Sequence, residues 1–252
     1  MSAAAGATAD TQGAPPAPSG QLDAPDHRPE GWPRAPEPMP RAWFERDPVT
    51  LARALLGHLV VRQDARRVRV GRIVETEAYA GMDDRASHAR AGRTKRTEPM
   101  FGPAGHAYVY LVYGMHHCLN VVAETEGRPA AVLIRALEPL TGAAAIRIAR
   151  RGTTVPEERL LAGPALACAG LSIDRNLDGH DLTLGRALWI AADVASTPGQ
   201  SRDAPLIVAG PRVGVGYAGP DWSSRAWRFG LSGSPSLSRP FPTAAGATHP
   251  TI

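Results

Sequence analysis

Two glutamates near the end of an alternating, valine-rich segment have the residue type and spacing to do acid–base chemistry. Glu75 and Glu77 lie in the run ETEAY at positions 75–79, within a segment, 68–79, whose alternation is typical of a β-strand. A carboxylate held at a strand end can take a proton from water, which makes Glu77 a candidate general base. Because successive strand side chains point to opposite faces, we expect four on one face: Ile73, Glu75, Glu77 and Tyr79.

Tyrosines in a second predicted strand have the chemistry to bind a flat ring. Tyr108 and Tyr110 lie in the predicted strand 107–112, and Tyr113, with the opposite parity to Tyr110, is expected to project from the turn that follows. Stacking on an aromatic ring stabilises a bound nucleobase by about 1–3 kcal/mol. A lone glutamate on a strand face is more often a solvated carboxylate, and tyrosines in a sheet usually just pack, so the pattern alone does not establish a site.

Other interpretations of these residues predict different chemistry. Glu75 and Glu77 would lie roughly 6–7 Å apart on one strand face, which suggests a retaining glycosidase with two carboxylates, whereas a structural or solvated Glu75 explains the pattern as well. His106, His116 and His117 have no further cysteine or acidic ligand at a useful spacing, and the zinc-deaminase signature is absent. The sequence predicts neither a metal site nor a cofactor.

The elements that position these residues begin with a helix and two strands. Asp47 can cap a helix over 48–56, with Pro48 at its first position and Gly57 at its end. Strands are expected at 58–62 and 68–79, joined by a turn near 63–67, and a loop at 82–106.

Three more strands and two helices are expected further along the chain. The strands are 107–112, 118–123 and 130–137, with turns at 113–114 and 126–129. Helical patterning covers 140–150 and 157–169, with Gly170 as a stop. Short strands and glycine turns follow, ending in the glycine-rich run 211–216. This order predicts a mixed α/β (α+β) fold in one domain: a curved, mainly antiparallel sheet with a protruding β-hairpin and flanking helices.

Composition divides the chain into an N-terminal segment, a central domain and a short C-terminal segment. Residues 1–40 hold nine of the 24 prolines and a net charge of −3, and we expect them to be disordered, as we do 240–252. The domain is therefore predicted at 41–239. Since the whole chain carries +4, the remainder carries about +7, which is compatible with a phosphate-backbone partner.

The sequence contains few signals that indicate a cellular location. No apolar run is long enough for a signal peptide or a membrane span, and the two cysteines form no CxxC pair, so we expect no membrane association and a cytoplasmic chain, near the nucleoid if it is prokaryotic. A monomer is expected because the sequence shows no recognisable pattern of a subunit interface.

Five segments together resemble one family. The strings GRIVETEAYAGMDDRASHA, TKRTEPMFGPAGHAYVYLVYGMHHCLNVV, VLIRALEPL, LLAGPALACAGL and RVGVGYAG occur in this order, and the chain resembles the alkyladenine (3-methyladenine) DNA glycosylases over roughly 48–239. The resemblance implies hydrolysis of the N-glycosidic bond of damaged purines that are flipped out of double-stranded DNA.

The resemblance also implies roles for single residues. Glu77 matches the general base and Tyr113 the side chain that wedges into the duplex. Asn120 matches the residue that disfavours a guanine 2-amino group. The base pocket is implied to contain Tyr79, His88, Tyr110, Asn120, Leu133 and Arg135. The DNA-binding set is expected to comprise Tyr113, Arg93, Thr94, Lys95, Arg96 and Met100. His116-His117 and Thr97-Glu98 depart from the family pattern, which leaves the fine geometry of the hairpin and the backbone affinity of the loop open.

One count bears on the product. Lys95 is the only lysine of the chain and belongs to the basic loop, away from the Glu77 strand, so an amine nucleophile for Schiff-base chemistry is not expected. A monofunctional enzyme that leaves an abasic site is favoured. Two alternatives remain: a binding module for damaged nucleic acid that does not cleave, and a hydrolase of free nucleosides.

Overall fold

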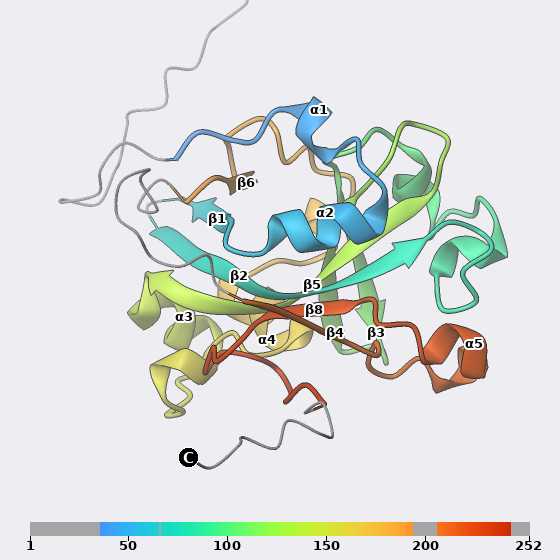
Figure 1. Ribbon diagram of the computed structural model, residues 1–252. Helices are drawn as coiled ribbons and strands as arrows, with labels where there is room; N and C mark the ends of the chain where they lie inside the picture. The colour runs from blue at the N-terminus through green and yellow to red at the C-terminus, as the bar shows by residue number, and fades with distance from the viewer. Residues whose placement is uncertain (1–35, 66, 194–205, 243–252) are drawn as a thin grey trace, which may run out of the picture.

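The computed structural model describes residues 36–65, 67–193 and 206–242 (Figure 1). The expected disorder of 1–35 and 243–252 lies outside the described residues. The described chain extends slightly past the predicted domain limits at both ends: the Trp189 indole donates to the Pro36 carbonyl, and Arg228 stacks on Phe241 at 4.0 Å.

Within the described residues, an eight-stranded sheet forms the body of the domain, in the order β3-β4-β5-β2-β1-β6, with β8 beside β2 and β7 beside β8. All of these pairings are antiparallel. The strands are β1 (Leu59–Asp64), β2 (Arg67–Ala80), β3 (Ala107–Val112), β4 (His116–Val122), β5 (Ala130–Thr141), β6 (Leu188–Ala191), β7 (Ile207–Gly210) and β8 (Arg228–Leu231). The predicted mixed α/β fold with a mainly antiparallel sheet is confirmed.

Short helices flank the sheet, with α2 over one face and α3 and α4 over the other (Figure 1). The α-helices are α1 (Arg41–Phe44), α2 (Pro48–Leu55), α3 (Ala143–Ala149), α4 (Pro164–Leu171) and α5 (Pro220–Ser223). The 3₁₀ turns are η1 (His88–Ala91), η2 (Glu98–Phe101), η3 (Glu157–Arg159), η4 (Arg175–Leu177) and η5 (Gly216–Ala218).

The helix predicted after Asp47 forms as α2, with the N-terminal cap that the sequence indicates. The Asp47 carboxylate accepts from the backbone N–H groups of Val49 and Thr50, which satisfies two donors that have no partner within the helix. Gly57 follows with a φ of 86° and turns the chain into β1. Leu51 and Leu55 are fully buried in the main core beneath this helix.

The two predicted helices after β5 differ from expectation. Leu140 still belongs to β5, and the helix begins only after Gly142, which adopts a φ of 81° and lies so close to the Val68 carbonyl that a Cβ would be 2.6 Å from it. The segment 157–169 splits into η3 and α4, because Pro164 sets a separate helix start.

Gly170 is not a stop, as the sequence suggested, but a packing residue inside α4. A Cβ at this position would lie 2.4 Å from a Leu161 methyl and 3.0 Å from a Ile146 methyl. The glycine therefore allows α4 to approach α3 and the chain before α4. The helix ends one residue later, at Leu171, and Ser172 caps it with a φ of 50°.

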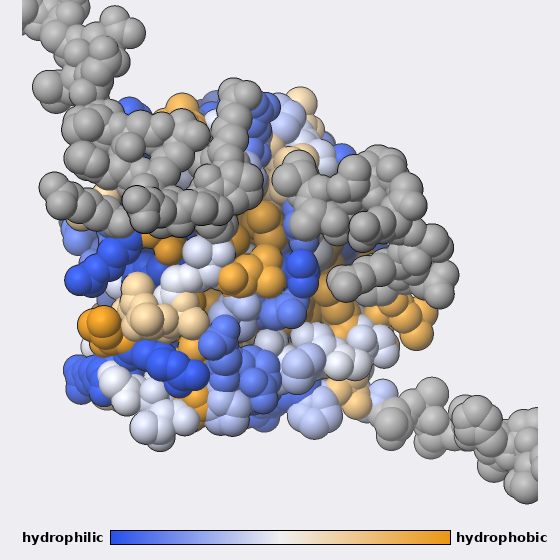
Figure 2. Space-filling view, turned by 90° about the vertical axis from the view of Figure 1, so that its left-hand side faces the viewer, coloured by the Kyte–Doolittle hydropathy of each residue, from blue (hydrophilic) through white to orange (hydrophobic). Residues whose placement is uncertain are grey.

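The residues with candidate chemistry come from one end of the sheet. β2 runs toward Ala80 at the end where α5 and the loop 81–106 lie (Figure 1). On the side that carries β1, β6 and α3, the visible described residues show hydrophilic and hydrophobic groups interspersed (Figure 2). The β3–β4 hairpin ends in a turn over 113–115, with Tyr113 in the left-handed conformation at a φ of 51°.

Candidate active site

Strand register brings the predicted pocket residues into rows across four strands. Glu77 of β2 is opposite Leu133 of β5. Leu133 is opposite Asn120 of β4, which is opposite Tyr108 of β3. Positions two residues away along each strand share this face. They contribute Tyr79, Ala131, Arg135, Cys118 and Tyr110.

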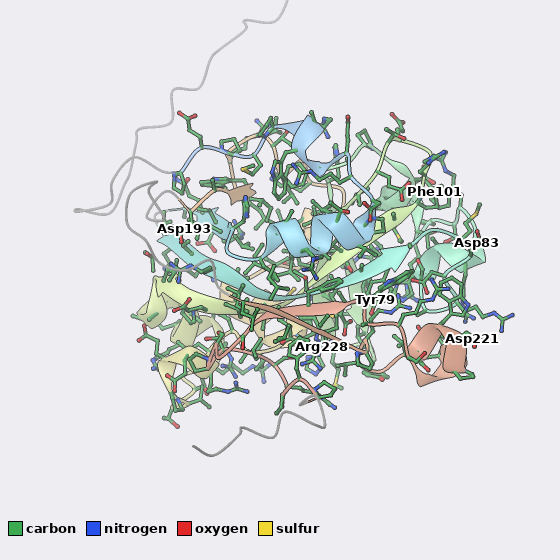
Figure 3. All side chains as sticks on the ribbon, viewed as in Figure 1. Tyr79, Asp83, Phe101, Asp193, Asp221 and Arg228 are labelled. Atoms are coloured by element: carbon green, nitrogen blue, oxygen red, sulfur yellow. The ribbon has the colours of Figure 1, made fainter. Side chains whose placement is uncertain are left out.

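These rows form the floor and walls of a cavity of about 460 Å³. Ligand sites in proteins commonly have volumes of about 300–1,000 Å³, so a purine base fits. Loops complete the lining with residues 86–88, Arg96, Met100, 213–215 and Tyr217, together with Pro164 at the start of α4. In Figure 3, Tyr79 lies toward the α5 end of β2, with Arg228 on the neighbouring strand β8.

Glu77 lies fully buried at the bottom of this cavity, with both carboxylate oxygens held. Oε1 accepts the Val213 backbone N–H at 2.7 Å and lies 3.3 Å from Nη1 of Arg135, while Oε2 accepts the Tyr79 hydroxyl at 2.8 Å. Burial raises the pKa of Glu77, whereas Arg135 and the two hydrogen bonds act to lower it. The site therefore holds a carboxylate that is more basic than one in water and is still supported as an anion.

Glu75 shares Arg135 with Glu77 but has further partners of its own, and it does not line the cavity. Its Oε1 accepts from Arg135 Nε at 3.0 Å and from Arg228 Nε at 2.7 Å, and its Oε2 accepts the Ser238 N–H at 2.6 Å. Register shifts in the β2–β5 pairing flank Glu75, and Ile73, expected on the same face, is buried in the main core. These contacts give Glu75 a structural role and remove the geometric basis for a two-carboxylate glycosidase.

Aromatic side chains line the cavity on two sides. Tyr79 comes from β2, and Tyr110 from β3 meets the His88 ring edge-on, with ring centres 4.5 Å apart. Nδ1 of His88 shares a 2.9 Å hydrogen bond with the Tyr108 hydroxyl. Burial, with help from Arg96, lowers the pKa of His88 to about 4, so its ring is neutral at neutral pH. Burial also raises the pKa values of Tyr79 and Tyr110, which keeps both phenols protonated.

Asn120 is fixed at the cavity floor by the backbone of the neighbouring strand β3. Its Nδ2 donates to the Tyr108 carbonyl at 3.0 Å, and the side chain is buried. Leu133 lies beside it in the same row and is 3% exposed. The structure thus brings together all seven residues predicted for catalysis and the pocket: Glu77, Tyr79, His88, Tyr110, Asn120, Leu133 and Arg135.

Five of the six residues expected to contact DNA take three different positions. Tyr113, 88% exposed, projects from the hairpin tip at the mouth of the cavity. Arg93, Thr94 and Lys95 are exposed in the loop, where Arg93 stacks on Phe101 and lies 3.7 Å from Glu98. Arg96 reaches the cavity and lies 3.3 Å from Nε2 of His88.

Met100 differs from the other members of the DNA-binding set. It is 2% exposed and packs with Phe101 and Tyr108 under the loop, where it lines the cavity. Its position is that of a pocket residue and not of a surface contact.

Several features of the site were not predicted from the sequence. The Val213 N–H, in the glycine-rich run 211–216, reaches Glu77 from 136 residues away. Cys118 and Tyr108 line the cavity; both have the strand parity of an assigned neighbour, Asn120 and Tyr110 respectively, and that parity was the available signal.

Among the described residues, no three histidine, cysteine or acidic side chains group as metal ligands would. His106, one of the three histidines considered, instead bonds with Arg41 and the Pro103 carbonyl. Within the same described ranges, every helix is too short or too polar to cross a bilayer.

Comparison with known proteins places this geometry in a family. The chain matches the methylpurine-DNA glycosylase family over residues 42–235. It is 50% identical over 210 residues to a putative 3-methyladenine DNA glycosylase of Anaeromyxobacter dehalogenans strain 2CP-1, covering 83% of this chain and 89% of that protein.

Similar proteins occur in distant organisms. A putative 3-methyladenine DNA glycosylase of Methanocella arvoryzae is 45% identical over 81% of this chain and 97% of its own length. The DNA-3-methyladenine glycosylase of Mus musculus is 42% identical over 78% of this chain and 60% of its own length. The match covers the strands and loops that build the cavity, and the chain belongs to the methylpurine-DNA glycosylase family.

Proposed function

We propose that this chain hydrolyses the N-glycosidic bond of alkylated or deaminated purines that are flipped out of double-stranded DNA, and leaves an abasic site. Its family makes it a DNA glycosylase, a hydrolase of DNA repair. The observation that carries the finer proposal is Glu77, a buried carboxylate held from three sides at the bottom of an aromatic cavity of base size. The proposed substrates are 3-methyladenine, 7-methylguanine, hypoxanthine and ethenoadenine.

Glu77 acts in this mechanism as the general base and as an anion opposite the reacting sugar. A carboxylate oxygen can accept two hydrogen bonds, so Oε2 can accept one from water in addition to that from Tyr79. The water oxygen bonds to C1′ of the sugar, its proton passes to Glu77, and the C1′–N bond electrons leave with the base. The negative charge of Glu77 also opposes the positive charge that develops on the sugar.

The leaving base determines whether a second proton is needed. A purine alkylated at a ring nitrogen carries a formal positive charge and departs as a neutral molecule. Hypoxanthine and ethenoadenine are neutral and need a proton as they leave. His88 faces the cavity with a pKa lowered to about 4, so it binds the base as a neutral hydrogen-bonding group.

The position of the lysine supports a monofunctional reaction. Lys95 is exposed in the loop and does not line the cavity, so its amine is remote from the sugar that Glu77 serves. Schiff-base chemistry would need such an amine at the reacting carbon. The abasic product should therefore remain unbroken until alkali is added.

The surface around the cavity mouth suits a duplex. Tyr113 is an exposed ring on a turn, and an inserted ring can hold the gap that a flipped nucleotide leaves. Arg93, Lys95 and Arg96 can neutralise backbone phosphates nearby. A hydrolase of free nucleosides would need neither feature, and a non-cleaving module would need no carboxylate as basic as Glu77.

Tyr113→Ala should slow excision from a fully paired duplex roughly tenfold, because unstacking a base step costs a few kcal/mol and the ring offsets part of it. The measurement is the excision rate at limiting enzyme, with the lesion paired or placed opposite a mismatch. Tyr113→Phe, which keeps the ring, should behave as wild type. Since a mispaired base is easier to extrude, the deficit of Tyr113→Ala should shrink on the mismatch. Equal rates for wild type and Tyr113→Ala on the paired duplex would contradict the wedge.

The proposed activity is tested with duplexes that each contain one hypoxanthine, ethenoadenine or 7-methylguanine. After incubation with the protein, half of each sample receives alkali, and strand breaks are counted in both halves. Breaks that need alkali on at least one lesion support a monofunctional glycosylase, and breaks without alkali would contradict the monofunctional product. No product on any lesion, with intact binding, would leave the non-cleaving module as the better account. A monomer in the cytoplasm or on the nucleoid stays a prediction.

A further inference from the structure

A buried ion pair lies behind the wall of the cavity and does not touch its interior. The Arg212 side chain is fully buried, and its Nη1 and Nη2 donate to the two carboxylate oxygens of Asp84 at 2.5 and 3.0 Å. Nη1 also donates to the Ala78 carbonyl at 2.9 Å and Nη2 to the Trp222 carbonyl at 3.2 Å. The two residues are 128 positions apart, so the pair joins distant parts of the chain.

The guanidinium group of Arg212 also lies against aromatic rings. Its central carbon is 4.9 Å from the centre of the Tyr79 ring and 5.1 Å from that of Trp227. Tyr79 lines the cavity wall, and its hydroxyl donates a hydrogen bond to Glu77. The Arg212 guanidinium therefore packs against the Tyr79 ring from outside the cavity, and its positive charge is attracted to the face of the ring.

Asp84 extends the pair into the loop that follows β2. Its Oδ2 accepts the Ala80 N–H at 3.1 Å, and its Oδ1 accepts the Ala86 N–H at 3.0 Å. The Ala80 bond fixes the end of β2 just after Tyr79, and the Ala86 bond fixes the chain two residues before His88. One carboxylate thus sets the start of the loop that carries a pocket residue.

Arg212 itself is next in sequence to the group that binds Glu77. Val213 follows it directly, and the Val213 N–H donates to Glu77 at 2.7 Å. Holding the Arg212 side chain on Asp84 therefore holds the peptide that contributes this hydrogen bond. Three segments that surround the cavity meet at the ion pair: the end of β2, the loop 81–88 and the loop 211–215.

We propose that Arg212, with Asp84 as its partner, is a positioning residue that holds the Val213 N–H on Glu77 and the Tyr79 ring at the cavity wall. This inference rests on the proposed role of Glu77 as the general base. Removing a partner from a buried ion pair leaves an uncompensated charge, so the pair has one favourable arrangement, which suits a positioning device.

The effect on Glu77 has a definite sign. The groups that face Glu77 are Arg135 from β5, Glu75 and Tyr79 from β2, and Tyr110 and Cys118 from β3 and β4. Of the contacts that lower the pKa of Glu77, the Val213 N–H depends on Arg212 through the backbone, and the Tyr79 hydroxyl depends on it through the ring. Loosening Arg212 should therefore raise the pKa of Glu77 further.

The test uses Arg212→Lys, which keeps the charge but cannot bond both Asp84 oxygens and two carbonyls at once. Asp84→Asn is the second variant, should Arg212→Lys fail to fold. The matched control is Arg69→Lys. Arg69 is also buried, 2% exposed, and pairs with Asp64 and the Gly170 carbonyl, but it does not line or border the cavity.

The first readout needs no activity: the pKa of the Glu77 carboxyl is measured by carbon NMR, with Glu77→Gln identifying the resonance. In Arg212→Lys and Asp84→Asn, the pKa of Glu77 should rise by about one unit, as expected for a lost hydrogen bond to a carboxylate. In Arg69→Lys it should equal that of wild type, although thermal stability falls in both arginine variants.

The second readout is the single-turnover excision rate of 7-methylguanine against pH, below the melting temperature of each variant. The acid limb of Arg212→Lys should move to higher pH by the same amount as the carboxyl pKa. An unchanged pKa of Glu77 in both test variants would overturn the proposal. If the pKa of Glu77 rises in both test variants while the wild-type protein cleaves no lesion, the positioning role stands and the proposed function fails.

Discussion

Glu77→Gln should reduce excision by about 10³-fold or more while the protein still binds lesion-containing duplex. General-base catalysis contributes about 10²–10⁴-fold, and the lost negative charge opposite the sugar adds to the deficit. The amide has nearly the same shape, and its oxygen can still accept the Val213 N–H. The measurement is the single-turnover rate on a hypoxanthine duplex at saturating protein, with binding followed by fluorescence anisotropy.

Glu75→Gln is the matched control for this substitution. Glu75 is equally buried on the same strand, but it bonds to Arg135, Arg228 and Ser238 instead of lining the cavity. We expect Glu75→Gln to lower the melting temperature and to lose far less of its excision rate than Glu77→Gln. Comparable losses of the chemical step in both variants, at a temperature where both are folded, would restore the two-carboxylate mechanism.

Arg135→Met should lower the free energy of unfolding by about 3–5 kcal/mol at neutral pH, because it leaves two buried carboxylates without their shared partner. The Arg135 side chain is 7% exposed and lies 3.0 Å from Glu75 and 3.3 Å from Glu77. Without it, the pKa of Glu77 rises further above the value in the unfolded chain. A raised carboxyl pKa means that the folded state holds the proton more tightly, so the deficit should grow as pH rises through the folded pKa and shrink as pH falls.

Urea unfolding at pH 5 and pH 8 measures this deficit. Arg72→Met is the control, since Arg72 also pairs with two carboxylates, Glu138 and Asp193, but its side chain is 25% exposed. Surface pairs contribute about 0–1 kcal/mol, so its loss should be much smaller. A loss for Arg135→Met no larger than that of Arg72→Met, or one independent of pH, would contradict the role given to Arg135.

Local patterns predicted the elements that hold the site. Alternation in 68–79 predicted Ile73, Glu75, Glu77 and Tyr79 on one face. Arg135 contacts both carboxylates and Tyr79 bonds to Glu77, whereas Ile73 packs in the main core beyond a register shift. The capped helix and the hairpin strands also follow from signals within a few residues. Such signals are local because caps and turns satisfy backbone groups nearby.

Those local patterns could not predict contacts between segments that are distant in the sequence. Gly170 looked like a helix stop because its packing against Leu161 and Ile146 depends on how α4 meets α3. The Val213 N–H and the Arg212–Asp84 pair also depend on where the loop 211–215 returns to β2. The resemblance supplied the roles of the pocket residues, but not these supports, which only the folded chain brings together.

The pH dependence of 7-methylguanine excision shows whether Glu77 activates the attacking water. This base carries its own positive charge and needs no acid to leave, so the acid limb of the single-turnover rate reports the general base. Since burial raises the pKa of Glu77, we expect a rate that is constant at high pH and falls with decreasing pH at a midpoint above the ordinary glutamate value of 4.5. A rate that does not fall as the pH decreases, or a midpoint below pH 4.5, would contradict Glu77 as the water-activating base.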